Sequence, residues 1–89
     1  MSNKYQLAFF LGITDPEALK ALPRPDTQKF KVLYLLSDYR WHDTEEIIDV
    51  AGSKSGMRRL REIRAELDHL VIQKESNGPG SFKYKLFHL

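Results

Sequence analysis

The apolar residues of this chain change their period once, near residue 70. Before that point they recur every three or four positions, as they do on one face of an α-helix. The clearest stripe of this kind consists of Met57, Leu60, Ile63, Leu67 and Leu70. After it the period falls to two, so that Phe82, Tyr84 and Leu86 lie opposite Lys83, Lys85 and Phe87. Helices followed by paired strands predict an α+β fold.

The last part of the chain has the composition of a β-hairpin. Residues 71–75 form one expected strand and residues 82–87 the other. Between them the sequence SNGPGS supplies the glycine and proline residues that favour a tight loop. The aromatic residues expected in the core are Phe30, Trp41, Phe82 and Tyr84.

A helix apolar on both sides is expected at residues 27–39, with Asp26 as its N-cap. One side carries Phe30, Leu33 and Tyr34, and the other carries Val32, Leu35, Leu36 and Tyr39. Such a helix needs two partners. One is the core of the domain, and the other is either the N-terminal segment or a second copy of the chain.

A short extended segment and a short helix follow. Residues 40–43, RWHD, would be extended, with Trp41 as an anchor and His42 as a structural residue. The helix would begin with Asp43 or Thr44 as its cap. Its inward residues would be Ile47, Val50 and Ala51.

The N-terminal residues 1–25 form an arm in this prediction, and residues 26–89 form the main domain. The two prolines of LPRPD separate them, because proline stops a helix. Asp15 or Thr14 would cap a helix that has Pro16 in its first turn. The stretch YQLAFFLGI is too apolar to stay bare on a small monomer. We expect it either to fold back on the helix at residues 27–39 or to dimerise with a second arm.

Composition excludes several kinds of site. The 89 residues include no cysteine, so disulfides, thiolate metal sites and a cysteine nucleophile are excluded. The three histidines lack metal-ligand spacing, and no phosphate-binding glycine loop or nucleophile elbow occurs. We therefore expect no enzyme, no cofactor and no metal site. The stretch LAFFLGI is too short to span a membrane, which favours a soluble cytoplasmic protein.

The net charge of +2 is unevenly distributed. Residues 1–52 hold six Lys or Arg against eight Asp or Glu, a net −2. Residues 53–89 hold eight against four, a net +4. The C-terminal half is therefore expected to carry a basic surface, which suits an anionic partner.

The order of elements resembles the winged helix-turn-helix family. The matching segments are TQKFKVLYLLSDYR, WHDTEEIIDVAG, SKSGMRRLREIRAEL and VIQKESNGPGSFKYKLF, within residues 27–87. The chain looks most like the small free-standing winged-helix proteins of phages, plasmids and prokaryotic genomes. The resemblance implies that helix 54–69 enters the major groove of double-stranded DNA and that the wing, residues 71–87, contacts its backbone. It also implies a role in transcriptional regulation.

On helix 54–69, which Ser53 or Ser55 would cap, the side chains divide by direction. Arg58 and Glu62 would point away from the buried stripe, with Arg61 beside them. Arginine donates to guanine and glutamate accepts from cytosine, so these three would read bases. Phosphate contacts at the helix start and flank would come from Lys54, Ser55 and Arg59. Arg64 would lie along the edge of the core.

The wing lysines, Lys74, Lys83 and Lys85, would also contact phosphates. Each basic set has a simpler interpretation. The lysines would only keep an edge hairpin soluble, and the arginines would only pair with Glu62 and Glu66 on the helix surface.

Four carboxylates argue against DNA binding, because they would repel any phosphate that faced them. They are Asp43, Glu45, Glu46 and Asp49. The alternative function is a protein-interaction module that uses this acidic helix or the apolar arm. RNA binding through the basic helix is a third hypothesis. A dimer formed through the arm would suit DNA, because paired half-sites increase affinity.

Overall fold

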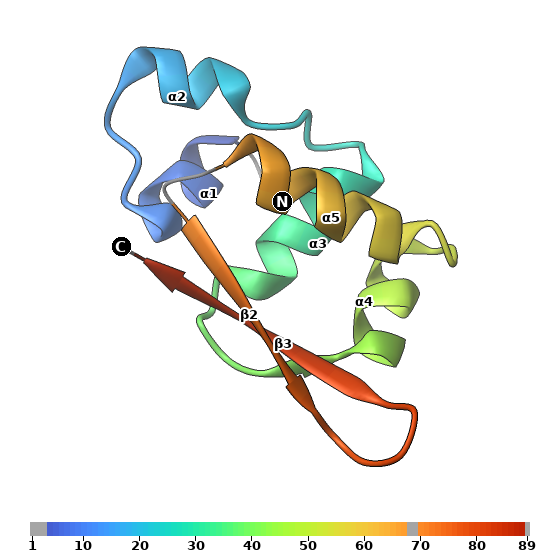
Figure 1. The fold of residues 1–89 in the computed structure, drawn as a ribbon. Helices are drawn as coiled ribbons and strands as arrows, with labels where there is room; N and C mark the ends of the chain where they lie inside the picture. Colours follow the sequence, from blue (N-terminus) through green and yellow to red (C-terminus); the bar gives the residue numbers. More distant parts are fainter. Residues whose placement is uncertain (1–3, 68–69, 89) are drawn as a thin grey trace.

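The computed structural model describes residues 4–67 and 70–88. These ranges form five helices and one antiparallel sheet with the strand order β1-β3-β2, so the expected α+β class is confirmed (Figure 1). The elements are α1 (Lys4–Leu11), α2 (Pro16–Ala21), α3 (Gln28–Leu36), β1 (His42–Asp43), α4 (Thr44–Ala51), α5 (Gly56–Glu66), β2 (Leu70–Ser76) and β3 (Phe82–His88). Within the described ranges, no helix has both the length and the hydropathy that crossing a bilayer requires.

The predicted hairpin is present, and the extended segment before α4 joins it as a third strand. Strands β2 and β3 pair from Leu70↔His88 to Ser76↔Phe82, and β1 pairs with β3 through His42↔Tyr84. The backbone N–H of Asn77 donates to the carbonyl of Ser81 at 3.0 Å and closes the loop.

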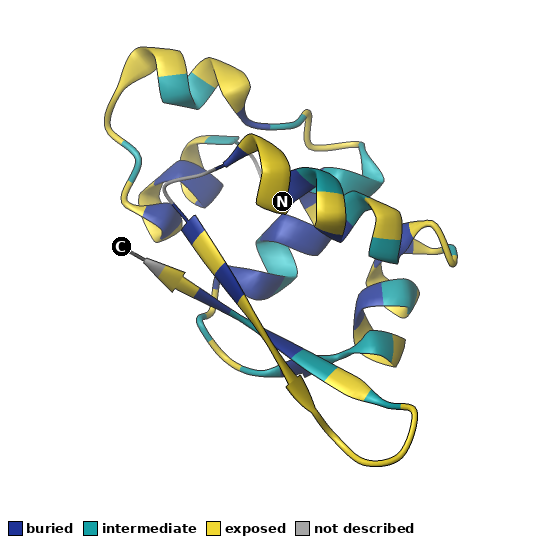
Figure 2. Ribbon diagram, viewed as in Figure 1, coloured by how far each residue is buried: buried dark blue, intermediate teal, exposed yellow. Residues whose placement is uncertain are grey.

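One face of the sheet covers the helices and the other faces outward. Paired residues of an antiparallel sheet share a face, and the inward face buries Leu70, Ile72, Tyr84 and Leu86. Phe82 lies on the same face but is 38% exposed, so its prediction as a core residue was wrong. The reason is that the hairpin extends past the helices, and its tip is exposed in Figure 2.

Helix α3 lies at the centre of the core, with its buried residues on both predicted sides. These are Phe30, Val32, Leu33 and Leu36. Its N-cap is Thr27, whose hydroxyl oxygen accepts from the backbone N–H of Phe30 at 3.2 Å. The predicted N-cap, Asp26, is therefore wrong by one residue. The Thr27 hydroxyl also donates to the carbonyl of Arg24 at 2.7 Å, which fixes the turn before the helix.

The N-terminal arm folds back on α3, which is one of the two predicted arrangements. Helix α1 buries Leu7, Ala8 and Leu11 in the same core as the rest of the chain. The Tyr39 hydroxyl donates to the carbonyl of Phe10 at 2.9 Å and ties α1 to the segment that follows α3. Helix α2 begins as expected, with Asp15 as N-cap and Pro16 in its first turn.

Helices α4 and α5 pack closely against each other. The Asp43 carboxylate caps α4 as predicted and accepts from the N–H of Glu46 at 2.8 Å. Ile47 and Ala51 are buried, but Val50 is 36% exposed, because it lies at the edge of the buried stripe. Gly56 begins α5 and is buried against Ala51.

Helix α5 is shorter than the predicted 54–69. Its N-cap is Ser55, and the last helical residue is Glu66. The expected stripe is buried at Leu60, Ile63 and Leu67. His69, which the sequence placed on the outer face, lies outside the described residues.

Candidate functional site

The outward face of α5 carries three exposed guanidinium groups. Arg58, Arg61 and Arg64 are exposed, and within residues 4–67 and 70–88 none of them forms an ion pair. Ala65, also exposed, keeps the middle of this face shallow. Arg64 is exposed, and the position of its stem along the core edge stays a prediction. This face is therefore a patch of positive charge that no carboxylate among the described residues pairs with.

Arg59 and Glu62 are directed elsewhere. The Arg59 Nη1 lies 2.7 Å from Glu62 Oε1 and donates to Oε2 at 3.1 Å. The two side chains are 29% and 30% exposed, so Glu62 does not point away from the core as predicted. They lie on the flank of α5 that faces α3. On the same flank Lys29 pairs with Glu66 at 2.9 Å.

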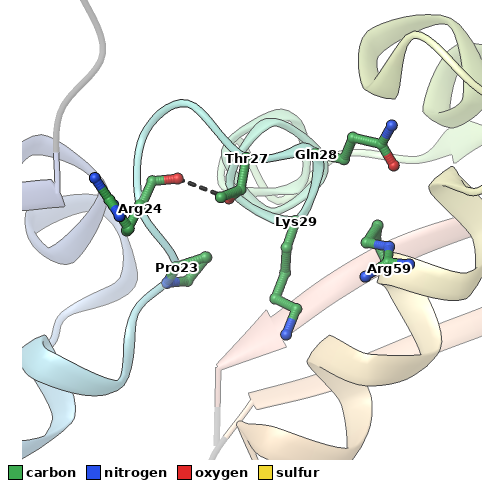
Figure 3. Close-up of a pocket in the computed structure, with 6 residues that line it drawn as sticks. All are labelled: Pro23, Arg24, Thr27, Gln28, Lys29 and Arg59. Carbon is green, nitrogen blue, oxygen red and sulfur yellow. Dashed lines mark hydrogen bonds between the residues drawn. The ribbon is translucent and has the colours of Figure 1, made fainter.

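A cleft of about 390 Å³ opens between the start of α3 and α5. Its lining residues are Pro23, Arg24, Thr27, Gln28, Lys29 and Arg59 (Figure 3). The Nε of Arg59 is buried without a hydrogen-bond partner among the described residues. Carboxylates already pair with two of the three cations that line the cleft, Lys29 and Arg59, so it is much less basic than the outer face of α5.

The start of α5 has no side-chain cap. Lys54 and Ser55 are exposed, and the Ser55 side chain accepts no hydrogen bond from the first turn. The Ser53 hydroxyl instead accepts from the N–H of Ser55 at 3.0 Å. The first turn of the helix thus keeps backbone donors and a lysine close together, as phosphate contact requires.

The three wing lysines lie on two different faces of the hairpin. Lys74 shares the inward face with Phe82, and its Nζ is 4.1 Å from the centre of that ring. Lys83 and Lys85 lie on the outward face, with their Nζ atoms 4.9 and 5.8 Å from the ring of Trp41. Trp41 is half-buried on this outer face, which corrects its prediction as a core residue. All three lysines were predicted to contact phosphates together. Successive side chains of a strand point to opposite faces of the sheet, so Lys74 lies on one face and Lys83 and Lys85 lie on the other.

An open hollow of about 360 Å³ is lined by Asp43, which caps α4, and by Glu45, Glu46 and Asp49 of the helix itself. Two of its four carboxylates are already engaged, because Asp43 caps the helix and Glu46 contacts His42. Glu45 and Asp49 are exposed, and no ion pair involves them within the described residues. A carboxylate that accepts from a backbone N–H keeps its charge, so the objection to DNA binding applies to Asp43 as well as to Glu45 and Asp49, and only Glu46 lies beside a group that can carry a positive charge.

His42 is buried between two carboxylates. Its Nε2 is 2.8 Å from Asp38 Oδ1 and its Nδ1 is 2.9 Å from Glu46 Oε2. Carboxylates accept only, so both ring nitrogens donate when the ring is protonated. Burial opposes this charge, but the hydrogen bonds and charges of Glu46 and Asp38 outweigh it and raise the pKa of His42. His42 is structural, as expected, and the sequence signal for its partners is the i, i+4 spacing on either side.

The described residues contain no group of three or more metal-ligating side chains that could hold an ion. The remaining distinctive surface is the outer side of α1, where Tyr5 and Phe9 are 75% and 80% exposed.

Comparison of the chain with known protein families, with curated proteins and with solved structures finds no match.

Proposed function

We propose that this chain is a winged helix-turn-helix protein that binds double-stranded DNA and regulates transcription. The observation that carries the proposal is the exposed set of Arg58, Arg61 and Arg64 on α5, none of which forms an ion pair with another residue that the structure describes. The element order and the sheet order β1-β3-β2 support it, since the hairpin follows α5 directly. A helix that fits the major groove needs such donors on the side away from the core.

Within this proposal the side chains have different roles. Arg58 and Arg61 read base edges, and Lys54 and Ser55 hold phosphates at the start of α5. Arg59 and Glu62 pair with each other and stiffen the flank of the helix. The wing contacts the backbone either through Lys74 or through Lys83 and Lys85, because these lie on opposite faces. Two copies joined through residues 1–25 would bind two half-sites.

A second candidate is a protein-interaction module. The exposed aromatic side chains of Tyr5 and Phe9 favour it, because isolated small domains rarely leave such residues bare. Glu45 and Asp49 would supply a separate acidic contact. RNA binding through α5 uses the same arginines, so the experiment below includes it.

The test is binding to a pool of random-sequence DNA duplexes, measured against salt, with duplex and single-stranded RNA as competitors. A DNA-binding protein should lose affinity with a log–log slope of about −0.9 for each phosphate contact. Selection from the pool should then yield a preferred sequence. No binding to any duplex at low salt, or preferential binding to RNA, would refute the proposal.

A further inference from the structure

Helix α1 presents aromatic side chains to solvent although its other side is anchored in the core. Tyr5, Phe9 and Phe10 are 75%, 80% and 40% exposed, whereas Leu7 and Leu11 are fully buried. The Phe9 and Phe10 rings meet edge to face, with their centres 6.0 Å apart. The Phe10 ring meets the Tyr34 ring in the same way, with 6.1 Å between the ring centres. The exposed patch thus continues directly into the core.

An open pocket of about 390 Å³ lies beside this patch. Its lining residues are Phe10, Tyr34, Leu35, Ser37 and Asp38. The charged group among them is Asp38, whose carboxylate already accepts from His42 at 2.8 Å and from the N–H of Arg40 at 2.9 Å. Because the Asp38 carboxylate already has these hydrogen-bond partners, an apolar side chain could enter the pocket without lying against an unpaired charge.

We propose that the α1 face joins two copies of this chain, with Phe9 of each copy inserted into the Phe10–Leu35 pocket of the other. A two-fold interface must be complementary to itself. This patch carries both a protruding aromatic ring and an apolar pocket, so one rotation would fill both pockets. Three partly exposed aromatics offer roughly 300–400 Å² of surface per copy, enough for the apolar centre of a standard interface.

In Figure 1, α1 and α4 lie on opposite sides of α3, so a partner on the α1 face would not cover α4. The proposal rests on the proposed function in one respect, because it locates the interface of the dimer proposed there. The dimer itself is argued from the α1 surface, and its formation is measured without nucleic acid. Its failure and the failure of DNA binding are therefore separate results.

The first experiment is molecular mass in solution, by light scattering and sedimentation at micromolar concentration. We expect twice the chain mass of 10.4 kDa. Phe9→Ser should weaken the dimer at least about 30-fold, as substitutions of central aromatic anchors do. Phe87→Ser, an exposed phenylalanine on the sheet, is the matched control and should leave the dimer intact. A monomeric native chain, or a dimer insensitive to Phe9→Ser, overturns the proposal.

The second experiment tests the contact itself and uses the absence of cysteine from the chain. A tagged Phe9→Cys chain is mixed with an untagged Leu35→Cys chain, at a concentration high enough to offset the loss of one of the two Phe9 anchors, and treated with a short thiol cross-linker. Cross-linked pairs of one tagged and one untagged chain are expected. A Phe87→Cys chain in place of Leu35→Cys should not react in this way. Equal cross-linking to both overturns the proposed geometry, even if a dimer forms.

Discussion

The guanidinium group of Arg59 lies 2.7 Å from the carboxylate of Glu62, on the flank of α5 that faces α3. This pair divides the arginines of the helix by role. Arg59 is held by a neighbour one turn along, whereas Arg58 and Arg61 have no ion-pair partner among the described residues. Substitutions in the two groups should therefore affect different properties.

Substitution of Arg58 or Arg61 should affect binding and leave folding unchanged. Both side chains are exposed, so Arg58→Ala or Arg61→Ala should alter the free energy of unfolding by less than about 0.5 kcal/mol. Each should cost about 1–3 kcal/mol in binding to the selected DNA sequence and relax the choice of base at one position. Lys20→Ala, an exposed cation on α2, is the control. Equal losses from all three variants would show that the arginines do not read sequence.

Substitution of Arg59 should affect folding. The pair with Glu62 is about 70% buried on each side, so its loss should cost about 0.5–1 kcal/mol of unfolding free energy. Urea unfolding of Arg59→Ala, Glu62→Ala and the double variant gives the coupling between them. Additive effects of the two single substitutions would mean that the ion pair contributes nothing to stability.

The burial of His42 between Asp38 and Glu46 predicts a pH-dependent stability. Because the pKa of His42 in the folded protein is raised above its ordinary 6.5, its contribution is complete below that pH and is lost as pH rises through the raised value. Burial would raise the pKa of Asp38, but hydrogen bonds from His42 and the Arg40 N–H lower it below 3.8. The contribution of Asp38 is thus present above pH 3.8 and is lost as pH falls through the lowered value.

Stability should therefore be greatest between these limits and should decline above neutral pH. The measurement is the urea midpoint from pH 4 to pH 9 for the native chain and for His42→Gln, which keeps a hydrogen-bonding side chain without the charge. The variant should be less stable at pH 5 and should lose the decline above neutral pH. An identical decline in both proteins would exclude His42 as its cause.

The elements of this fold could be predicted because their signals are local. Caps such as Asp15 and Asp43, and the change from helical to alternating period near residue 70, depend on neighbours a few positions away. The alternation in β3 also assigned Phe82 to the right face. It could not show that the hairpin extends past the helices, and so Phe82 was wrongly placed in the core.

The candidate site was predicted less completely, because it depends on tertiary packing. Helical geometry identified Arg58 and Arg61 as outward, and the structure exposes both. It could not show that the flank carrying Glu62 would face α3, where the carboxylate pairs with Arg59. Trp41 was similarly misplaced, because its ring lies under Lys83 on the outer face of the sheet.

Gly56 carries the last prediction, since its missing side chain sets how closely α4 and α5 approach. A Cβ atom at this position would lie 2.9 Å from Cβ of Ala51 and 3.1 Å from the carbonyl oxygen of Ile47. Alanine is favoured over glycine within helices by about 1 kcal/mol. The overlap should exceed that gain, because neither Ala51 nor the backbone of α4 can rotate away.

We therefore expect Gly56→Ala to lower the free energy of unfolding by about 1–3 kcal/mol, the usual cost of overpacking a core. Removing the opposing methyl group should relieve part of this cost. The double variant Gly56→Ala with Ala51→Gly should thus lose less unfolding free energy than the two single variants lose together. Thermal or urea unfolding would measure this difference. A more stable Gly56→Ala chain would mean that α4 and α5 separate easily and that their close packing does not fix the angle of α5.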